Sequence, residues 1–325
     1  MSEPSYELGT AATKASPLLI SVVIPMFNES DACGHLFERL LPILDALPCA
    51  YEVICVDDGS VDSTLVQLAE FRKKNSRIKI IALARNFGKD VALTAGIDAS
   101  NGDAVIPLDA DLQDPPELIP ELYREWRTGS DMVIAVRSDR SHDGVFKRLS
   151  AAAFYQLMKA FSEIPIPINA GDFRLLDRKV VSALKTIPER NRFMKGLFAW
   201  VGFTQSTVTY SRPPRVAGRT KWRPWKLWNF GLEGILSFTT LPLRIWTYLG
   251  FGISILAIGR GAYILVRTLW EGVEVPGYAS LFVAVAFFSG IHMIGIGIIG
   301  EYLGRIFIEV KQRPLYIVRE AIGFE

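Results

Sequence analysis

One stretch near the C-terminus limits the possible folds of this chain more than any other. From Tyr278 to Gly300, about 23 residues carry no formal charge, and a helix of that length spans a bilayer. A second, mostly apolar segment runs from Leu241 to about Leu269. The linker Glu271–Gly277 has no Lys or Arg, whereas basic residues flank both segments on their outer sides. This pattern predicts two transmembrane helices, at 241–270 and 277–300, with both termini in the cytoplasm.

The first of these segments is less regular than the second. It contains Arg244, Arg260 and Arg267, and an arginine inside a membrane usually faces a partner or a polar cavity. The alternative for both segments is a pair of buried helices in a soluble protein. We expect a multi-pass protein of the cell membrane.

The rest of the chain has a different pattern. Short apolar runs, mostly β-branched, alternate there with segments whose apolar residues recur at helical spacing. Such alternation predicts βαβ units and a mostly parallel sheet, so the fold class is α/β. We expect this domain at 18–214, after a flexible tail at 1–17. The apolar runs are Leu19–Ile24, Tyr51–Val56, Ile78–Leu83, Ala104–Leu108 and Met132–Val136.

Two further segments border the apolar helices. The stretch 215–240 contains Lys221–Trp228, in which tryptophans and cations alternate, a combination that favours the headgroup layer of a bilayer. We therefore predict an amphipathic juxtamembrane segment, with a solvated run of charges as the alternative. The stretch 301–325 places its apolar residues up to Val310 on one side, which predicts an amphipathic cytoplasmic segment at the membrane surface.

Composition argues against several classes of protein. The 36 Lys and Arg nearly balance the 34 Asp and Glu, and we expect no nucleic-acid partner. The 3 cysteines and 3 histidines are too few and too scattered for a disulfide framework or a shared metal site. No GxGxxG follows a strand and no GxxxxGK[ST] occurs, which removes the main support for dinucleotide and P-loop proteins.

Polar segments follow four of the predicted strands, at the sheet edge where such folds bind ligands. In the last segment Asp109 and Asp111 stand two residues apart and Gln113 follows. Such oxygens can bind a hard divalent cation that also holds a diphosphate. Taken alone, an acidic turn is more often a solvated loop, and Asp, Gly and Ser also favour turns. The segments are Pro25–Glu29, Asp57–Ser60, Arg85–Lys89 and Asp109–Asp114.

These motifs, in this order, resemble those of family 2 glycosyltransferases with the GT-A fold, and the likeness covers about 18–320. The chain is most similar to polyprenyl-phosphate glycosyltransferases, such as dolichol-phosphate mannose synthase and bactoprenol glucosyltransferases. The resemblance implies a GT-A catalytic domain followed by two transmembrane helices. The six motifs are Val23–Glu29, Asp57–Ser60, Arg85–Lys89, Asp109–Glu117, Gly171–Leu175 and Gly218–Lys221.

The resemblance also implies a reaction. It is the inverting transfer of a hexose, with glucose from UDP-glucose favoured, to an undecaprenyl-type polyprenyl phosphate. Mannose or an amino sugar stays open as the sugar. A phosphate monoester is largely dianionic near neutral pH, because its second pKa is about 6, so it needs cations more than a general base. The partners are a nucleotide-sugar donor, polyprenyl phosphate and the bilayer, and we expect a homo-oligomer.

The family pattern assigns roles residue by residue. Residues expected at the nucleotide and its diphosphate are Pro25, Phe27, Glu29, Val56, Asp58, Lys89, Asp109 and Ala110. Residues expected to hold the divalent cation, Mg²⁺ or Mn²⁺, are Asp111 and Gln113. Residues expected in catalysis are Asp109, Asp111, Arg137, Arg215 and Lys221, with Arg148 and Ser150 as further candidates for the acceptor phosphate.

The chain departs from the family pattern at three positions. Phe27 stands where tyrosine is usual, Asp90 replaces a common glutamate, and Asn169 stands where aspartate is frequent, which puts a catalytic role there in doubt. Two other classes compete. A processive polysaccharide synthase would carry a Gln-x-x-Arg-Trp motif and more membrane helices, and neither is visible. A non-enzymatic nucleotide-sugar sensor would not need Asp109, Asp111 and the basic cluster together.

Overall fold

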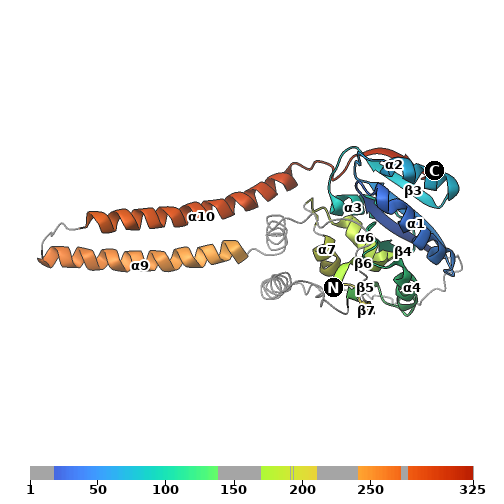
Figure 1. Cartoon of the computed structure of the whole chain (residues 1–325). Helices are drawn as coiled ribbons and strands as arrows, with labels where there is room; N and C mark the ends of the chain where they lie inside the picture. The colour runs from blue at the N-terminus through green and yellow to red at the C-terminus, as the bar shows by residue number, and fades with distance from the viewer. Residues whose placement is uncertain are drawn as a thin grey trace, which may run out of the picture.

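The computed structural model describes residues 18–137, 170–190, 192, 194–210, 241–271 and 277–324. Within these residues, an α/β domain is joined to two long helices that extend away from it side by side (Figure 1). The predicted tail and the juxtamembrane segment lie outside the described residues. So do five of the singled-out positions, Arg148, Ser150, Asn169, Arg215 and Lys221.

The α/β domain is built on one sheet with the strand order β7-β5-β6-β4-β1-β2-β3-β8. Four of its seven pairings are parallel: β1 with β2 and β4, β2 with β3, and β5 with β7. The predicted fold class, α/β with a mostly parallel sheet, is confirmed. The strands are β1 Leu19–Met26, β2 Ala50–Asp57, β3 Ile78–Leu83, β4 Ala104–Pro107, β5 Met132–Arg137, β6 Ala170–Asp177, β7 Gln205–Tyr210 and β8 Val318–Ile322.

Helices cover both faces of the sheet. Successive side chains of a strand point to opposite faces, so Val22 and Ile24 of β1 pack in one apolar cluster and Val23 in the other. Leu36 and Leu40 of α1 belong to the first cluster. Burial on both faces leaves the carboxyl ends of β1, β2 and β4 as the polar edge. The helices are α1 Ser30–Asp45, α2 Thr64–Lys74, α3 Lys89–Ala99, the 3-10 helix η1 Pro116–Leu118, α4 Ile119–Arg127, α6 Arg178–Thr186 and α7 Met194–Trp200.

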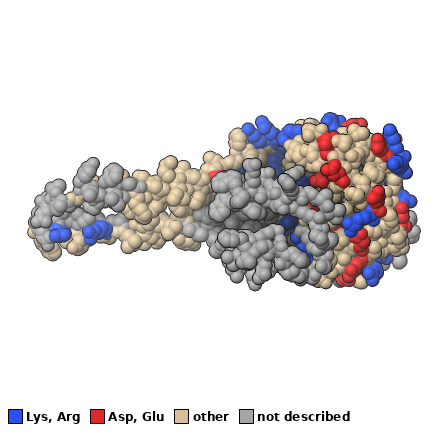
Figure 2. All heavy atoms as spheres, viewed as in Figure 1, with Lys and Arg blue, Asp and Glu red and all other residues tan. Residues whose placement is uncertain are grey.

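The two long helices are α9, Leu241–Glu271, and α10, Tyr278–Val310. They meet where the Trp246 side chain lies so close to Gly295 that a Cβ there would overlap it. Among the described residues, one segment is long and apolar enough to cross a membrane, the 24 residues Phe287–Val310 of α10. Figure 2 shows most of the charged atoms on the α/β domain rather than on the helix pair. The two-helix anchor therefore stays a prediction, supported so far by one helix.

The C-terminal segment differs from the predicted amphipathic stretch at 301–325. Its first residues continue α10 to Val310, and its last part forms β8, which pairs antiparallel with β3. The Ala84 amide donates to the Ile317 carbonyl at 2.9 Å, next to this pairing. An edge strand such as β3 has backbone groups that a further strand can satisfy. The segment after α10 is therefore part of the sheet of the α/β domain, which the helical spacing before Val310 did not indicate.

Candidate active site

The acidic turn after β2 caps the start of α3. One Asp58 carboxylate oxygen accepts from the Phe87 amide at 2.7 Å, and the other accepts from the Gly88 amide at 2.9 Å. The side chain is 3% exposed, and burial raises the pKa of Asp58 although both hydrogen bonds oppose this. Asp58, predicted to contact the nucleotide, is thus already held by backbone amides at a helix N-terminus, where anions are favoured.

Three strand-end segments are bound to one another around this turn. Gly59 has φ +72°, and a Cβ there would lie 2.6–2.9 Å from the backbone of Arg85 and Asn86, so only glycine fits. The Asn28 amide donates to the Ser60 hydroxyl at 2.9 Å, and the Val61 amide donates to the Asn28 side chain at 2.9 Å. These contacts fix the backbone beside Phe27. The Phe27 ring is 41% exposed and keeps a free face for stacking.

Lys89, the first residue of α3, joins the ends of two strands. Its ammonium lies 2.8 Å from the Asp109 carboxylate after β4 and 2.8 Å from the Asp172 carboxylate on β6. Burial would raise the pKa of Asp172, but Lys89 outweighs it and holds this pKa at about 2. Burial raises the pKa of Asp109, and the two carboxylates raise the pKa of Lys89. The structure therefore brings the predicted pair Lys89 and Asp109 together.

Asp172 is a site residue that the sequence prediction missed. It lies in the Gly171–Leu175 motif, which carried the family resemblance without a role for its acid. One Asp172 carboxylate oxygen, Oδ1, is buried and has no hydrogen-bond partner among the described residues. The available signal was an acidic residue inside a motif that carried the resemblance.

Asp111 and Gln113 contact each other in the turn after β4. Leu112 between them has φ +54°, and Asp111 accepts from the Gln113 backbone amide at 3.1 Å and from the Gln113 side-chain amide. No described Lys or Arg lies within ion-pair distance of Asp111, in contrast to Asp109. Carboxylate and amide oxygens are ligands that hard divalent cations take. The chemistry of this pair therefore fits such a cation.

The described residues contain no group of three or more His, Cys, Asp or Glu placed to hold a metal ion. Mg²⁺ is commonly held by one or two carboxylates together with substrate phosphates. A cation at Asp111 would accordingly need oxygens from a ligand to complete its coordination.

Arg137, at the end of β5, lies against two polar residues to which the sequence analysis assigned no role. Its Nε donates to the Tyr210 hydroxyl at 3.4 Å, and its guanidinium is 3.8 Å from the Asp114 carboxylate. The Tyr210 hydroxyl in turn donates to Asp114. Burial and the Asp114 charge raise the pKa of Tyr210 to about 12, so this hydroxyl stays protonated. Asp114 and Tyr210 thus hold the cation that was predicted to face phosphate.

The remaining predicted residues differ in what they can offer a ligand. Val56 is fully buried and Ala110 is 4% exposed, so these two could contribute only backbone groups. Pro25 and Glu29 are half-buried beside Phe27. The Glu29 amide donates to the Thr64 hydroxyl at 2.9 Å, which joins this segment to the turn after β2.

The fold and site define an α/β protein that carries carboxylates and a lysine where parallel strands end. Residues 21–185 match glycosyl transferase family 2, and the chain belongs to that family. It is a glycosyltransferase, and its α/β domain has the GT-A fold.

The relatives match almost the whole chain. An uncharacterized glycosyltransferase of Synechocystis sp. is 56% identical over 306 residues, which cover 94% of this chain and 96% of that protein. The SfII prophage-derived bactoprenol glucosyl transferase of Shigella flexneri is 47% identical over 302 residues, covering 93% and 98%. Among solved structures, a mannosyltransferase of Pyrobaculum calidifontis in complex with GDP-Man and Mn²⁺ is similar with a TM-score of 0.47 and 17% identity, covering 87% and 84%.

Proposed function

We propose that this enzyme transfers a hexose, glucose from UDP-glucose, to the phosphate of an undecaprenyl-type polyprenyl lipid with inversion at the anomeric carbon. The observation that carries the proposal is the 47% identity to a bactoprenol glucosyl transferase over 93% of this chain. That alignment is too long to be confined to the α/β domain and must include most of α9 and α10. Mannose or an amino sugar is the alternative for the transferred sugar.

The donor is expected at the polar edge of the sheet. Phe27 offers a face to the nucleobase, and Lys89 and Asp109 lie at the strand ends where the diphosphate would be held. Lys89 is shared between Asp109 and Asp172, so a diphosphate that contacts this lysine would take its third N–H or replace one of the two carboxylates. A divalent cation, Mg²⁺ or Mn²⁺, held by Asp111 and Gln113 would offset the charge on the leaving diphosphate.

The acceptor supplies its own nucleophile. A phosphate oxygen attacks C1 of the sugar, the new C1–O bond forms, and the bond from C1 to the nucleotide diphosphate breaks. Since the phosphate monoester is already largely dianionic, no side chain has to remove a proton. Arg137 is the described candidate to bind this phosphate, and Asp114 and Tyr210 restrict its position. Arg215 and Lys221, with Arg148 and Ser150, are the further candidates.

The membrane placement is part of the proposal. The α/β domain and both termini would lie on the cytoplasmic side, and α9 and α10 would cross the cell membrane with Val273 and Val275 at the outer tip. Cysteines introduced there should react with an impermeant reagent added to whole cells. Reaction only after lysis contradicts the two-pass arrangement.

We also propose that the protein is a homo-oligomer. The mass of the purified protein in detergent would test this proposal.

The test of the reaction uses purified full-length protein with polyprenyl phosphate and radiolabelled UDP-glucose, UDP-N-acetylglucosamine or GDP-mannose. The expected product is a labelled lipid formed from UDP-glucose together with UDP, and a chelator should abolish it until Mg²⁺ or Mn²⁺ is added. Transfer from a different donor would change the sugar and leave the reaction class in place. Donor binding without any lipid product would favour the sensor and contradict the proposal.

A further inference from the structure

A groove of about 340 Å³ lies where the C-terminal end of α10 reaches the α/β domain. Phe307 and Ile308 of the last turn of α10 line it, together with Leu315 of the segment before β8 and Val91 of α3. Figure 2 shows Lys and Arg atoms gathered in this region, where α10 joins the domain in Figure 1. The groove thus combines apolar walls with a positive rim.

Three cations line this groove: Arg190, Lys311 and Arg313. The Lys311 ammonium lies 4.0 Å from the centre of the Phe307 ring. No described carboxylate is within ion-pair distance of any of the three side chains. The neighbouring Glu309 uses a carboxylate oxygen to accept from the Arg190 backbone amide at 2.8 Å. The positive charge of the groove is therefore not neutralised by ion pairs within the described residues.

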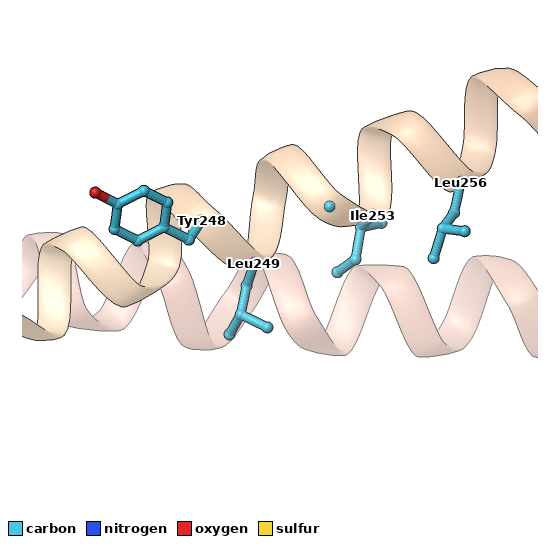
Figure 3. Close-up of a pocket in the computed structure, with 5 residues that line it drawn as sticks. Tyr248, Leu249, Ile253 and Leu256 are labelled. Atoms are coloured by element: carbon cyan, nitrogen blue, oxygen red, sulfur yellow. The ribbon is translucent and has the colours of Figure 1, made fainter.

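A second groove, on α9, is apolar but has no positive rim, and it serves as a comparison. Tyr248, Leu249, Gly252, Ile253 and Leu256 line it, and the labelled side chains in Figure 3 all project from α9. No cation is among these residues, and nothing in the structure indicates a particular occupant. The groove at the end of α10 differs because an apolar chain and an anionic group would each find a matching surface there.

The position of the groove along α10 identifies the anion. The membrane-compatible segment Phe287–Val310 ends immediately before Lys311. Lys and Arg directly beyond a transmembrane helix lie at the level of the lipid headgroups and attract anionic lipids. Side chains such as Lys also extend their charge into the headgroup layer while their stems cover apolar surface.

We propose that this groove binds an anionic bilayer phospholipid, with its phosphate among Arg190, Lys311 and Arg313 and an acyl chain along Phe307 and Ile308. The inference rests on the proposed membrane position of α10 and goes beyond the proposed reaction, because no residue assigned to donor or acceptor takes part. A bound lipid would fix the end of α10. Because β8 follows and pairs with β3, it would also set the height of the catalytic sheet above the bilayer.

The test is native mass spectrometry of the purified full-length protein titrated with short-chain phosphatidylglycerol or phosphatidylcholine. Phosphatidylglycerol should bind in preference, and the double variant K311A/R313A should bind it about tenfold or more weakly. The matched control K73A/K74A removes two exposed charges from α2 and should change the affinity less than about twofold. The charge-keeping variant K311R/R313K should bind as the wild type does, which separates lost charge from misfolding.

Three outcomes would overturn the inference. The first is equal binding of the two lipids, and the second is an equal loss of affinity in the K311A/R313A variant and the K73A/K74A control. The third is displacement of phosphatidylglycerol by polyprenyl phosphate, together with a matching rise in the acceptor KM of K311A/R313A, because the groove would then belong to the acceptor. Lipid binding is measured without turnover, so failure of the proposed reaction would leave this result readable.

Discussion

The two acidic turns of the site have similar compositions and different partners. After β2, both oxygens of the Asp58 carboxylate are bound by backbone amides of Phe87 and Gly88. After β4, Asp109 and Asp111 are bound by the side chains of Lys89 and Gln113. A backbone amide at a helix start cannot leave its position, whereas a side chain can change rotamer. The first turn is therefore suited to hold the fold, and the second to exchange a protein partner for a ligand.

The carboxylates near the turn after β4 share the ammonium of Lys89. Asp109, Asp172 and Asp90 all lie near Lys89, and their mutual repulsion appears in the pKa values. Burial and the Asp172 charge raise the pKa of Asp90 to about 6. A divalent cation bound beside these carboxylates would reduce that repulsion. The turn after β2 has its charge compensated by a helix N-terminus instead.

The sharpest test of the comparison is Asp111→Asn. The change keeps the size of the side chain and one of the two oxygens that accept from Gln113, but removes the charge proposed to hold the metal. We expect turnover to fall about 100-fold or more, because the cation is expected to stabilise the leaving diphosphate by several kcal/mol. The thermal midpoint should stay within about 2 °C, since no described cation pairs with Asp111.

Turnover of Asp111→Asn is measured over a range of Mg²⁺ concentrations, beside the unfolding midpoint. Asp45→Asn is the matched control, because it removes an exposed carboxylate that pairs with Arg77 on the surface. Near-normal turnover of Asp111→Asn at limiting metal would show that the turn after β4 does not carry the cation.

The second test addresses the turn after β2. Asp58→Ala leaves the Phe87 and Gly88 amides without their acceptor in a buried place, which costs about 2–3 kcal/mol. We expect the thermal midpoint of the full-length protein to fall by about 5–10 °C. Asp58→Asn retains one acceptor oxygen, so its thermal midpoint should lie between those of the wild type and Asp58→Ala. If Asp58→Ala has the thermal midpoint of the wild type but loses donor binding, the turn after β2 binds the nucleotide directly. The proposed difference between the two turns would then be wrong.

The sequence indicated five of the eight strands of the sheet. The five apolar runs became β1 to β5 because strands buried on both faces are apolar throughout. β6 was missed since it contains Arg174, which is buried with its guanidinium 4.2 Å from the Phe198 ring centre. β7 and β8 were missed because they are edge strands with several polar residues.

The same limit applies to the candidate site. Lys89, Asp109, Asp111 and Gln113 were predictable because each follows a buried strand or starts a helix. Asp172 and the pair Asp114 and Tyr210 were not, because their contacts join residues 83 and 96 positions apart in the chain. Contacts between residues so far apart in the chain depend on which strands become neighbours in the sheet. No local sequence pattern encodes the order β5-β6-β4.

The third test asks whether Lys89 acts by its charge. Lys89→Gln removes the ammonium that joins Asp109 and Asp172 and leaves Lys195 and Arg174 as the cations near Asp172. The pKa of Asp172, now held at about 2, should therefore rise. We expect the Kd for UDP, measured by calorimetry, to rise roughly tenfold, because one charge-assisted contact is lost. Lys74→Gln on the surface of α2 is the control. An unchanged Kd would mean that Lys89 only neutralises its two carboxylates.

The last test concerns Asp90, which lies in the first turn of α3. Its pKa is raised from 3.8 to about 6, so between these values the folded protein binds more protons than the unfolded chain. Stability contributed by this group is therefore lost as pH rises through about 6, because the buried carboxylate must then carry its charge. Asp90→Asn removes that cost at pH 7.5 and keeps one side-chain oxygen that can face the Met194 amide, whose interaction lowers the pKa of the wild-type carboxyl group. Two effects oppose the gain: the new NH₂ group needs an acceptor, and the helix N-terminus loses a negative charge.

For Asp90→Asn we expect a net gain of about 1 kcal/mol in the free energy of unfolding at pH 7.5, or about 2–4 °C in the thermal midpoint. This gain should become smaller as the pH is lowered to 5. A stability gain of equal size at pH 7.5 and pH 5 would mean that Asp90→Asn acts through packing and not by removing the charge of the buried carboxylate. A loss of stability at pH 7.5 would mean that Lys89 and Lys195 stabilise the ionised form of Asp90 more than burial opposes it.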